Sequence, residues 1–220
     1  MTGSTLHYIF DPLCGWCYAA APLIAAAQHL PGLGIALHGG GMMTGERRRR
    51  ITPDWRGYVL PHDRRIAQMT GQVFGPGYTD GLLNDTSALL DSAPPTTAIL
   101  AAEQLAGKGL AMLQRLQQAH YVQGLRIAEP AVLQELAPEL GLPREEFAQA
   151  YAALEGAATE AHFAQSRRLL AMAGGQGFPT LALQTAPDQP LQRIEPSGWL
   201  GQPEAFAAAL ASALPAAHPD

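Results

Sequence analysis

The segment that decides the fold is LHYIFDPLCGWCYAAAPLIAAAQHL, residues 6–30. Its first five residues form a short β-rich run that ends at Asp11-Pro12, which predicts a strand followed by a break. From Cys14 onward the sequence predicts a helix, and Pro22 is expected to kink it because proline lacks a backbone N–H. Residues 33–38 predict a second strand. A strand–helix–strand unit of this kind is right-handed and has parallel strands.

The rest of the chain has a different pattern. Between residues 53 and 174, apolar residues recur at helical spacing and glycine–proline breaks separate several helices. One of these helices is expected to start at Asp91-Ser92, where capping side chains precede two prolines. The β pattern returns at residues 177–184 and 191–194, and residues 203–214 predict a final helix. We therefore predict an α/β protein in the order βαβ, helical segment, ββα.

Composition and charge narrow the functional classes. The chain has 220 residues, 47% of them hydrophobic, so it can bury a sizeable core without metal or disulfide cross-links. Its net charge of −5 gives no reason to expect nucleic acid or an anionic membrane as partner. The one basic run, Arg47 to Arg50, is interpreted as a solvated loop. The chain shows neither a signal-peptide pattern nor an apolar stretch of membrane-spanning length, so we expect a cytoplasmic protein.

The two cysteines, Cys14 and Cys17, are the only ones in the chain. A structural disulfide between them would close almost no loop and would constrain the unfolded chain little. In a reducing compartment such a pair is more often catalytic or metal-binding. Zinc requires about four cysteine or histidine ligands. The seven histidines are scattered and provide no second close pair, so no metal is expected.

The position of the pair at a strand-to-helix junction has a chemical meaning. Cys14 lies where the first backbone N–H groups of a helix lack partners and the helix dipole is positive, so its thiolate should be stabilised. Cys17 follows about one turn later, within reach of a disulfide. Cys14 can therefore attack a disulfide to form a mixed disulfide, which Cys17 then resolves.

The motif Asp11 to Tyr18, with Gly177-Phe178-Pro179-Thr180 far downstream, resembles the DsbA-like branch of the thioredoxin superfamily, and most of all the FrnE-like protein-disulfide isomerases. The resemblance covers nearly the whole chain. It implies a thioredoxin-like domain of residues 1–52 and 175–220 with a helical domain of residues 53–174 inserted. It also implies that Pro179 is a cis-proline facing the two cysteines.

The resemblance implies further site residues. Phe178 would present its backbone beside the disulfide, where a substrate peptide could pair with it. Gly15 and Trp16, between the cysteines, would tune the reduction potential, and potentials in the superfamily span roughly −270 to −120 mV. Trp16 is also expected to offer an apolar contact to substrate, or else to lie in the core. Asp11 is close enough to the helix start to act as a proton acceptor for Cys17, although a turn-forming aspartate needs no such role.

We therefore expect a thiol–disulfide reductase or isomerase without a bound cofactor, with protein or peptide thiols and disulfides as partners. Glutathione is a possible electron donor, and the protein is expected to be a monomer or homodimer. Two alternatives stay open. The first is a glutathione-dependent enzyme of the kappa-class transferase or hydroxychromene-carboxylate isomerase type, in which serine generally replaces the first cysteine. The second is a redox-inactive, chaperone-like peptide-binding protein.

Overall fold

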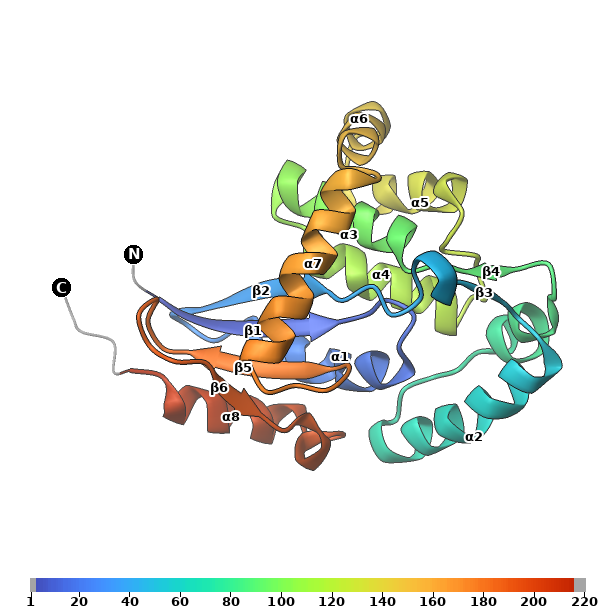
Figure 1. Cartoon of the computed structure of the whole chain (residues 1–220). Helices are drawn as coiled ribbons and strands as arrows, with labels where there is room; N and C mark the ends of the chain where they lie inside the picture. Colours follow the sequence, from blue (N-terminus) through green and yellow to red (C-terminus); the bar gives the residue numbers. More distant parts are fainter. Residues whose placement is uncertain (1–2, 216–220) are drawn as a thin grey trace.

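A four-stranded mixed sheet forms the centre of the protein in the computed structural model, which describes residues 3–215 (Figure 1). Its strands lie in the order β2 (Leu33–Gly39), β1 (Ser4–Phe10), β5 (Thr180–Gln184) and β6 (Gln192–Ile194). β1 and β2 are parallel, whereas β5 and β6 are each antiparallel to their neighbour. The predicted α/β fold of thioredoxin-like topology is confirmed.

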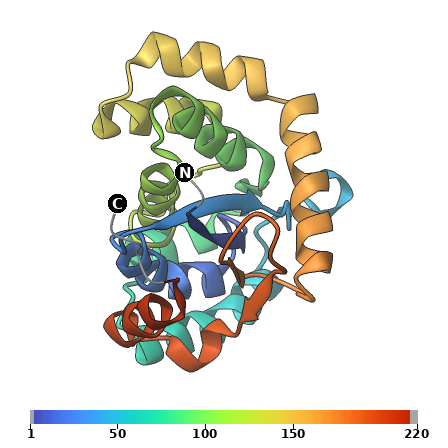
Figure 2. The ribbon, with the colours of Figure 1, turned by 90° about the vertical axis from the view of Figure 1, so that its left-hand side faces the viewer.

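Helices cover both faces of this sheet. α1 (Gly15–Ala27) and α8 (Pro203–Ala213) pack together on one face, and α7 (Ala157–Met172) runs across the other beside β2 (Figures 1 and 2). Because β1 is central and covered from both sides, Tyr8 and Ile9 on its opposite faces are only 1% and 0% exposed. α1 continues through Pro22. Its first residues follow directly from β1, which places the cysteines at one end of the sheet.

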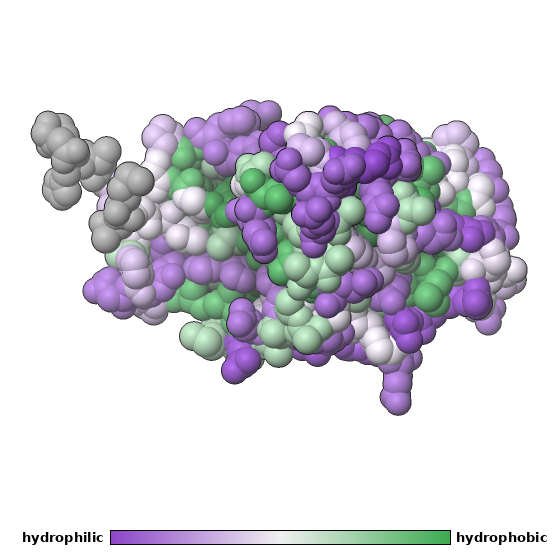
Figure 3. Space-filling model, turned by 90° about the horizontal axis from the view of Figure 1, so that it is seen from above, coloured by the Kyte–Doolittle hydropathy of each residue, from purple (hydrophilic) through white to green (hydrophobic). Residues whose placement is uncertain are grey.

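The middle of the chain is helical, as its periodicity predicted. Besides α7 it contains α2 (Pro53–Thr70), α3 (Ala93–Ala106), α4 (Gly109–Tyr121), α5 (Pro130–Leu136) and α6 (Arg144–Leu154). α3 is central in this group and contacts α4, α6 and α7. The face seen from above carries hydrophilic residues interspersed with smaller apolar patches (Figure 3). Within residues 3–215, no helix is both long and apolar enough to span a bilayer.

Two local features differ from the sequence-based expectations. α3 starts where predicted, but only one of the two predicted capping side chains acts as a cap, that of Asp91, whose Oδ1 accepts a hydrogen bond from the backbone N–H of Ala93 at 2.9 Å. The Ser92 side chain makes no cap contact and points to the interior instead. A short second sheet, β3 (Arg49–Arg50) with β4 (Leu89–Leu90), was not predicted, because two-residue strands leave no periodic pattern.

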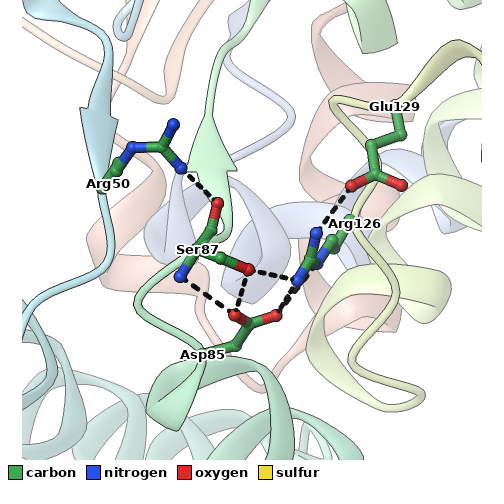
Figure 4. Close-up of polar contacts among 5 residues, drawn as sticks. All are labelled: Arg50, Asp85, Ser87, Arg126 and Glu129. Carbon is green, nitrogen blue, oxygen red and sulfur yellow. Dashed lines mark hydrogen bonds and ion pairs between the residues drawn. The ribbon is translucent and has the colours of Figure 1, made fainter.

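A polar cluster holds the loop before β4 to the loop before α5 (Figure 4). The Arg126 guanidinium pairs with Asp85 and, at 2.9 Å, with Glu129. Asp85 also accepts hydrogen bonds from the backbone and hydroxyl of Ser87, whose carbonyl oxygen accepts from Arg50 on β3. This cluster therefore ties the small sheet to the helical segment.

The start of α2 is fixed by a side-chain cap. Thr52 Oγ1 accepts a hydrogen bond from the backbone N–H of Trp55 at 3.1 Å, and Pro53 takes the first helical position, where no N–H is needed. The helix ends at Gly71, whose φ of 74° is left-handed. α2 is therefore set at both ends by local sequence.

We expect Thr52→Ala to lower the free energy of unfolding by about 1 kcal/mol, because one N–H at the start of α2 loses its acceptor. Thr52→Ser keeps the oxygen and should stay close to the wild type. Urea unfolding followed by circular dichroism measures both variants. Equal stability of the alanine and serine variants would show that the cap does not stabilise the protein.

Candidate active site

Three loops meet at one end of the sheet to form the site. Residues 11–14 follow β1, residues 40–43 follow β2, and residues 177–179 precede β5. Since β1 and β2 are parallel and β5 is antiparallel to β1, the two strand ends and the one strand start lie together. The site is thus built from segments about 170 residues apart in the chain.

The two cysteines differ in access to solvent. Cys14 is the N-cap residue of α1 and is 8% exposed, whereas Cys17 in the first turn is 0% exposed. Both are free thiols. The Cys14 carbonyl accepts hydrogen bonds from the backbone N–H groups of Cys17 at 2.9 Å and Tyr18 at 3.1 Å, which fixes the first turn. Of the two cysteines, Cys14 alone lines the surface groove described below.

The surroundings of Cys17 favour its protonated form. Burial raises its pKa well above the usual value, and the hydrogen bond and negative charge of Cys14 raise it further. The Asp11 backbone N–H points at Cys17 Sγ at 3.5 Å and opposes this shift only in part. The hydroxyl of Tyr8, on β1, donates a hydrogen bond to the Cys17 carbonyl oxygen at 3.1 Å. Cys17 is therefore held as a buried thiol.

The loop before β5 faces Cys14. The Phe178–Pro179 peptide bond is cis, and the Phe178 carbonyl oxygen lies 3.5 Å from Cys14 Sγ. The Phe178 ring lies on the backbone of Gly40, where an added Cβ atom would come within 2.1 Å of it. The sequence-predicted residues Phe178 and Pro179 are thus beside the cysteines, and Gly40 provides the space for the ring.

The Asp11 carboxylate joins the first two loops. It is 0% exposed and accepts hydrogen bonds from the backbone N–H of Leu13 at 3.0 Å and of Met42 at 2.6 Å. The hydroxyl of Ser92, at the start of α3, donates to the same carboxylate at 2.9 Å. Burial raises the pKa of Asp11 to about 6, although the three hydrogen bonds counteract the shift. Its carboxylate thus binds these loops, its backbone N–H points at Cys17, and its negative charge helps to raise the pKa of that thiol.

Two residues that sequence reasoning missed hold the loop after β2. Ser92 accepts from the backbone N–H of Met43 at 3.0 Å. Arg167 of α7 donates to the carbonyl oxygens of Gly40 at 3.2 Å and Gly41 at 3.3 Å. Ser92 had been assigned to a helix cap, and Arg167 carried no local signal. Both contacts join positions far apart in sequence.

A groove of about 360 Å³ runs along the exposed side of Cys14. It lies between the Cys-Gly-Trp-Cys turn, the loop after β2 and one face of α2. The α2 face contributes Trp55, Tyr58, Val59, His62, Asp63 and Ile66. These residues recur at helical spacing, which was the signal in the sequence that could have predicted this wall. We call this space the active-site groove.

Gly15 and Trp16 form the floor of the active-site groove beside Cys14. A Cβ atom on Gly15 would lie 3.3 Å from Asp63 Oδ1, so α1 and α2 approach closely here. The Asp63 carboxylate accepts a hydrogen bond from the Tyr78 hydroxyl at 3.1 Å, and burial raises its pKa to about 6. Trp16 is half-buried, with the Arg65 guanidinium 5.8 Å above its ring. Trp16 therefore both packs against the core and lines the groove.

The described part of the chain contains no group of three or more metal-ligating side chains close enough to hold an ion. The arrangement offers instead an accessible thiol at a helix N-terminus, a buried thiol behind it and a backbone carbonyl beside it. These are the groups required for thiol–disulfide exchange through a mixed disulfide.

Comparisons with solved structures agree with this chemistry. The cytosolic disulfide reductase DsbM from Pseudomonas aeruginosa is 56% identical, with a TM-score of 0.89, 95% of this chain and 98% of that chain being covered. A second DsbM structure, with GSH, is 55% identical with a TM-score of 0.88 and the same coverage. Neither the protein-family models nor the curated proteins include a match.

More distant structures show the fold alone. A candidate protein disulfide isomerase from Nitrosomonas europaea is 24% identical, with a TM-score of 0.76 and coverage of 96% of this chain and 97% of that one. A 2-hydroxychromene-2-carboxylate isomerase is 15% identical, with a TM-score of 0.57 and coverage of 94% and 95%. The same architecture thus occurs in proteins of different chemistry.

The fold and the thiol pair define a thiol–disulfide oxidoreductase of the DsbA-like branch of the thioredoxin superfamily, as the sequence motifs predicted. Within that branch the chain belongs to the DsbM family of disulfide reductases.

We expect Gly40→Ala to destabilise the protein by about 1–3 kcal/mol, because the new methyl group must displace the Phe178 ring. Gly34→Ala on β2 is the matched control, since its Cβ atom would meet only the Ser4 carbonyl at 3.8 Å. Urea unfolding compares the two variants. Equal, small effects would mean that Phe178 moves aside without cost.

The pH dependence of stability should report on Asp11. Because its pKa is raised from 3.8 to about 6, the folded protein binds a proton in this range that the unfolded chain releases. The stability of the wild type, relative to Asp11→Asn, should therefore fall as the pH rises from 4 to 6 and then become constant.

Urea unfolding of the wild type and of Asp11→Asn from pH 4 to 8 measures this difference. NMR titration of the Asp11 carboxyl carbon in the wild type gives the pKa directly. If the stability of the wild type relative to Asp11→Asn rises between pH 4 and 6, the pKa of Asp11 is not raised in the folded protein.

Proposed function

We propose that the protein is a cytosolic, glutathione-dependent reductase of protein disulfides, in which Cys14 attacks and Cys17 resolves. One observation carries this assignment of roles: Cys14 lines the active-site groove, whereas Cys17 is fully buried and has a raised pKa. A substrate disulfide can reach the first sulfur but not the second.

The reaction runs in two exchanges. The Cys14 thiolate attacks one sulfur of the substrate disulfide, and the other sulfur leaves as a thiolate that takes up a proton. Cys17 then loses its proton and attacks Cys14 Sγ, which releases the second substrate thiol and leaves a Cys14–Cys17 disulfide. The substrate gains two electrons and two protons. Because Cys17 is held protonated, the second exchange depends on removal of that proton.

Glutathione is proposed as the electron donor. One glutathione thiolate attacks Cys14 Sγ and frees Cys17, and a second attacks the bound glutathione sulfur, giving oxidised glutathione and the dithiol. The DsbM structure with GSH supports this choice. Arg47 and Arg49 line the active-site groove and match the two carboxylates of glutathione in charge.

The remaining predicted site residues are proposed to bind substrate. The Phe178 carbonyl, next to the cis-proline, would accept a hydrogen bond from a substrate backbone N–H once Cys14 is in the mixed disulfide. Trp16 would provide an apolar contact, and Gly15 would let the chain approach the sulfur closely. Asp11 is proposed as a positioning residue, since its carboxylate binds the two loops.

The division of the chain stays a proposal of the same kind. Residues 1–52 and 175–220 would form the thioredoxin-like domain and residues 53–174 the helical insertion, whose α2 supplies one wall of the active-site groove.

The proposed cytosolic location rests on the DsbM relative. Partners would be protein or peptide disulfides and glutathione, with the protein acting as a monomer or homodimer.

The cysteine variants test the proposal. Cys14→Ser should abolish reduction of hydroxyethyl disulfide in an assay coupled through glutathione and glutathione reductase. In Cys17→Ser, Cys14 should still attack a disulfide, but the mixed disulfide is not resolved. This variant should therefore accumulate a glutathione adduct on Cys14, which mass spectrometry detects after acid quenching. Catalysis that survives in Cys14→Ser would contradict the assigned roles.

The same variants separate the alternatives. A chaperone-like protein would prevent aggregation of an unfolded client equally well with Cys14→Ser. A glutathione-dependent isomerase of small molecules would turn over such a substrate without forming a Cys14–Cys17 disulfide. An equilibrium titration in glutathione buffers, with free thiols counted by mass, detects that disulfide directly.

A further inference from the structure

Four consecutive arginines, Arg47 to Arg50, lie beside the active-site groove, and all four are exposed. Together with the first turns of α2 they line a hollow of about 580 Å³ that is widely open to solvent. We call this the arginine hollow. The sequence predicts a solvated loop for these four arginines, but in the structure their side chains line a hollow on the surface.

The arginine hollow adjoins the active-site groove. Arg47, Arg49, Trp55 and Tyr58 line both spaces. The Arg49 guanidinium lies 4.7 Å from the centre of the Trp55 ring, and Tyr58 is 60% exposed next to it. A peptide bound at Cys14 that crosses this aromatic edge therefore enters the hollow.

The charges around this path are mainly positive. Arg47 and Arg50 donate to the carbonyl oxygens of Gly41 and Ser87, which orient the guanidinium groups without neutralising them (Figure 4 for Arg50). Among residues 3–215, Arg48 is the one member of the run in an ion pair, with Asp91 at 3.4 Å.

Two carboxylates, Glu46 and Asp54, also line the hollow. Arg65 lies over Trp16, which lines the active-site groove. The cluster of arginines beside the groove contrasts with the net charge of −5 of the chain.

We propose that the arginine hollow binds carboxylate side chains of protein substrates, so that the enzyme prefers disulfides flanked by acidic residues. This inference rests on the proposed reductase function and names its substrate class. Glutathione is short enough to be held in the active-site groove, whereas Arg48 and Arg50 line only the hollow beyond it. They can therefore select among longer peptides without affecting the reaction with glutathione.

The test compares three disulfide-linked peptides that differ only in the two residues next to the cysteine. These residues are two aspartates in the first peptide, two serines in the second and two lysines in the third. At low ionic strength we expect kcat/KM for the acidic peptide to exceed that for the lysine peptide by about tenfold or more, because charge steering has this magnitude. The ratio should fall toward one in 0.5 M salt.

Arg48→Gln/Arg50→Gln should remove most of this preference while the rate with hydroxyethyl disulfide stays unchanged. Arg48→Lys/Arg50→Lys keeps the charge and should keep the preference. Arg64→Gln/Arg168→Gln alters the net charge equally at exposed sites outside the hollow and should have no effect. Thermal unfolding of each variant checks that β3 still forms.

The outcomes distinguish the two proposals. If the wild type does not reduce hydroxyethyl disulfide, the proposed reductase function itself is wrong. Normal reduction with equal rates for all three peptides, or an equal loss of preference in the Arg64/Arg168 control, would overturn only the carboxylate site. Tighter binding of a single-stranded oligonucleotide than of the acidic peptide at the hollow would also overturn it.

Discussion

The active site depends on one buried charge, the Asp11 carboxylate. A carboxylate without access to water is unfavourable unless hydrogen-bond donors surround it, and here two backbone N–H groups and one hydroxyl do so. These donors come from the loop before Cys14, the loop after β2 and the start of α3. Oδ1 accepts from Leu13 and Ser92, and Oδ2 accepts from Met42 alone, so the carboxylate links all three segments.

The arrangement of the two sulfurs follows from this anchoring. Cys14 ends a loop that Asp11 holds in place, and its side chain faces the active-site groove. Cys17 lies one turn further into α1, above the Tyr8 hydroxyl and out of contact with solvent. A short helical motif thus provides one accessible and one protected thiol, and the difference comes from burial rather than from residue type.

The sequence predicted those parts of the structure that local patterns determine. The four strands of the central sheet, the cysteine pair and the cis geometry of the Phe178–Pro179 bond could be expected from short motifs. The contacts of Ser92 with Asp11 and of Arg167 with the loop after β2 could not, because they join residues 81 and about 127 positions apart. Neither residue type is unusual in a helix or at its start, so nothing in the local sequence marked them.

The order of the sheet has a consequence for synthesis of the chain. Among the described strands β1 comes before β5 in the chain by about 170 residues, yet the two are neighbours in the sheet, and Thr5 pairs with Gln184. Until β5 has been made, the nascent chain can present Cys14, Cys17 and the α2 wall but has no partner for one edge of β1. Such distant pairing closes a long loop and slows folding. The two thiols are therefore synthesised well before the loop at Phe178, which faces Cys14 in the folded protein.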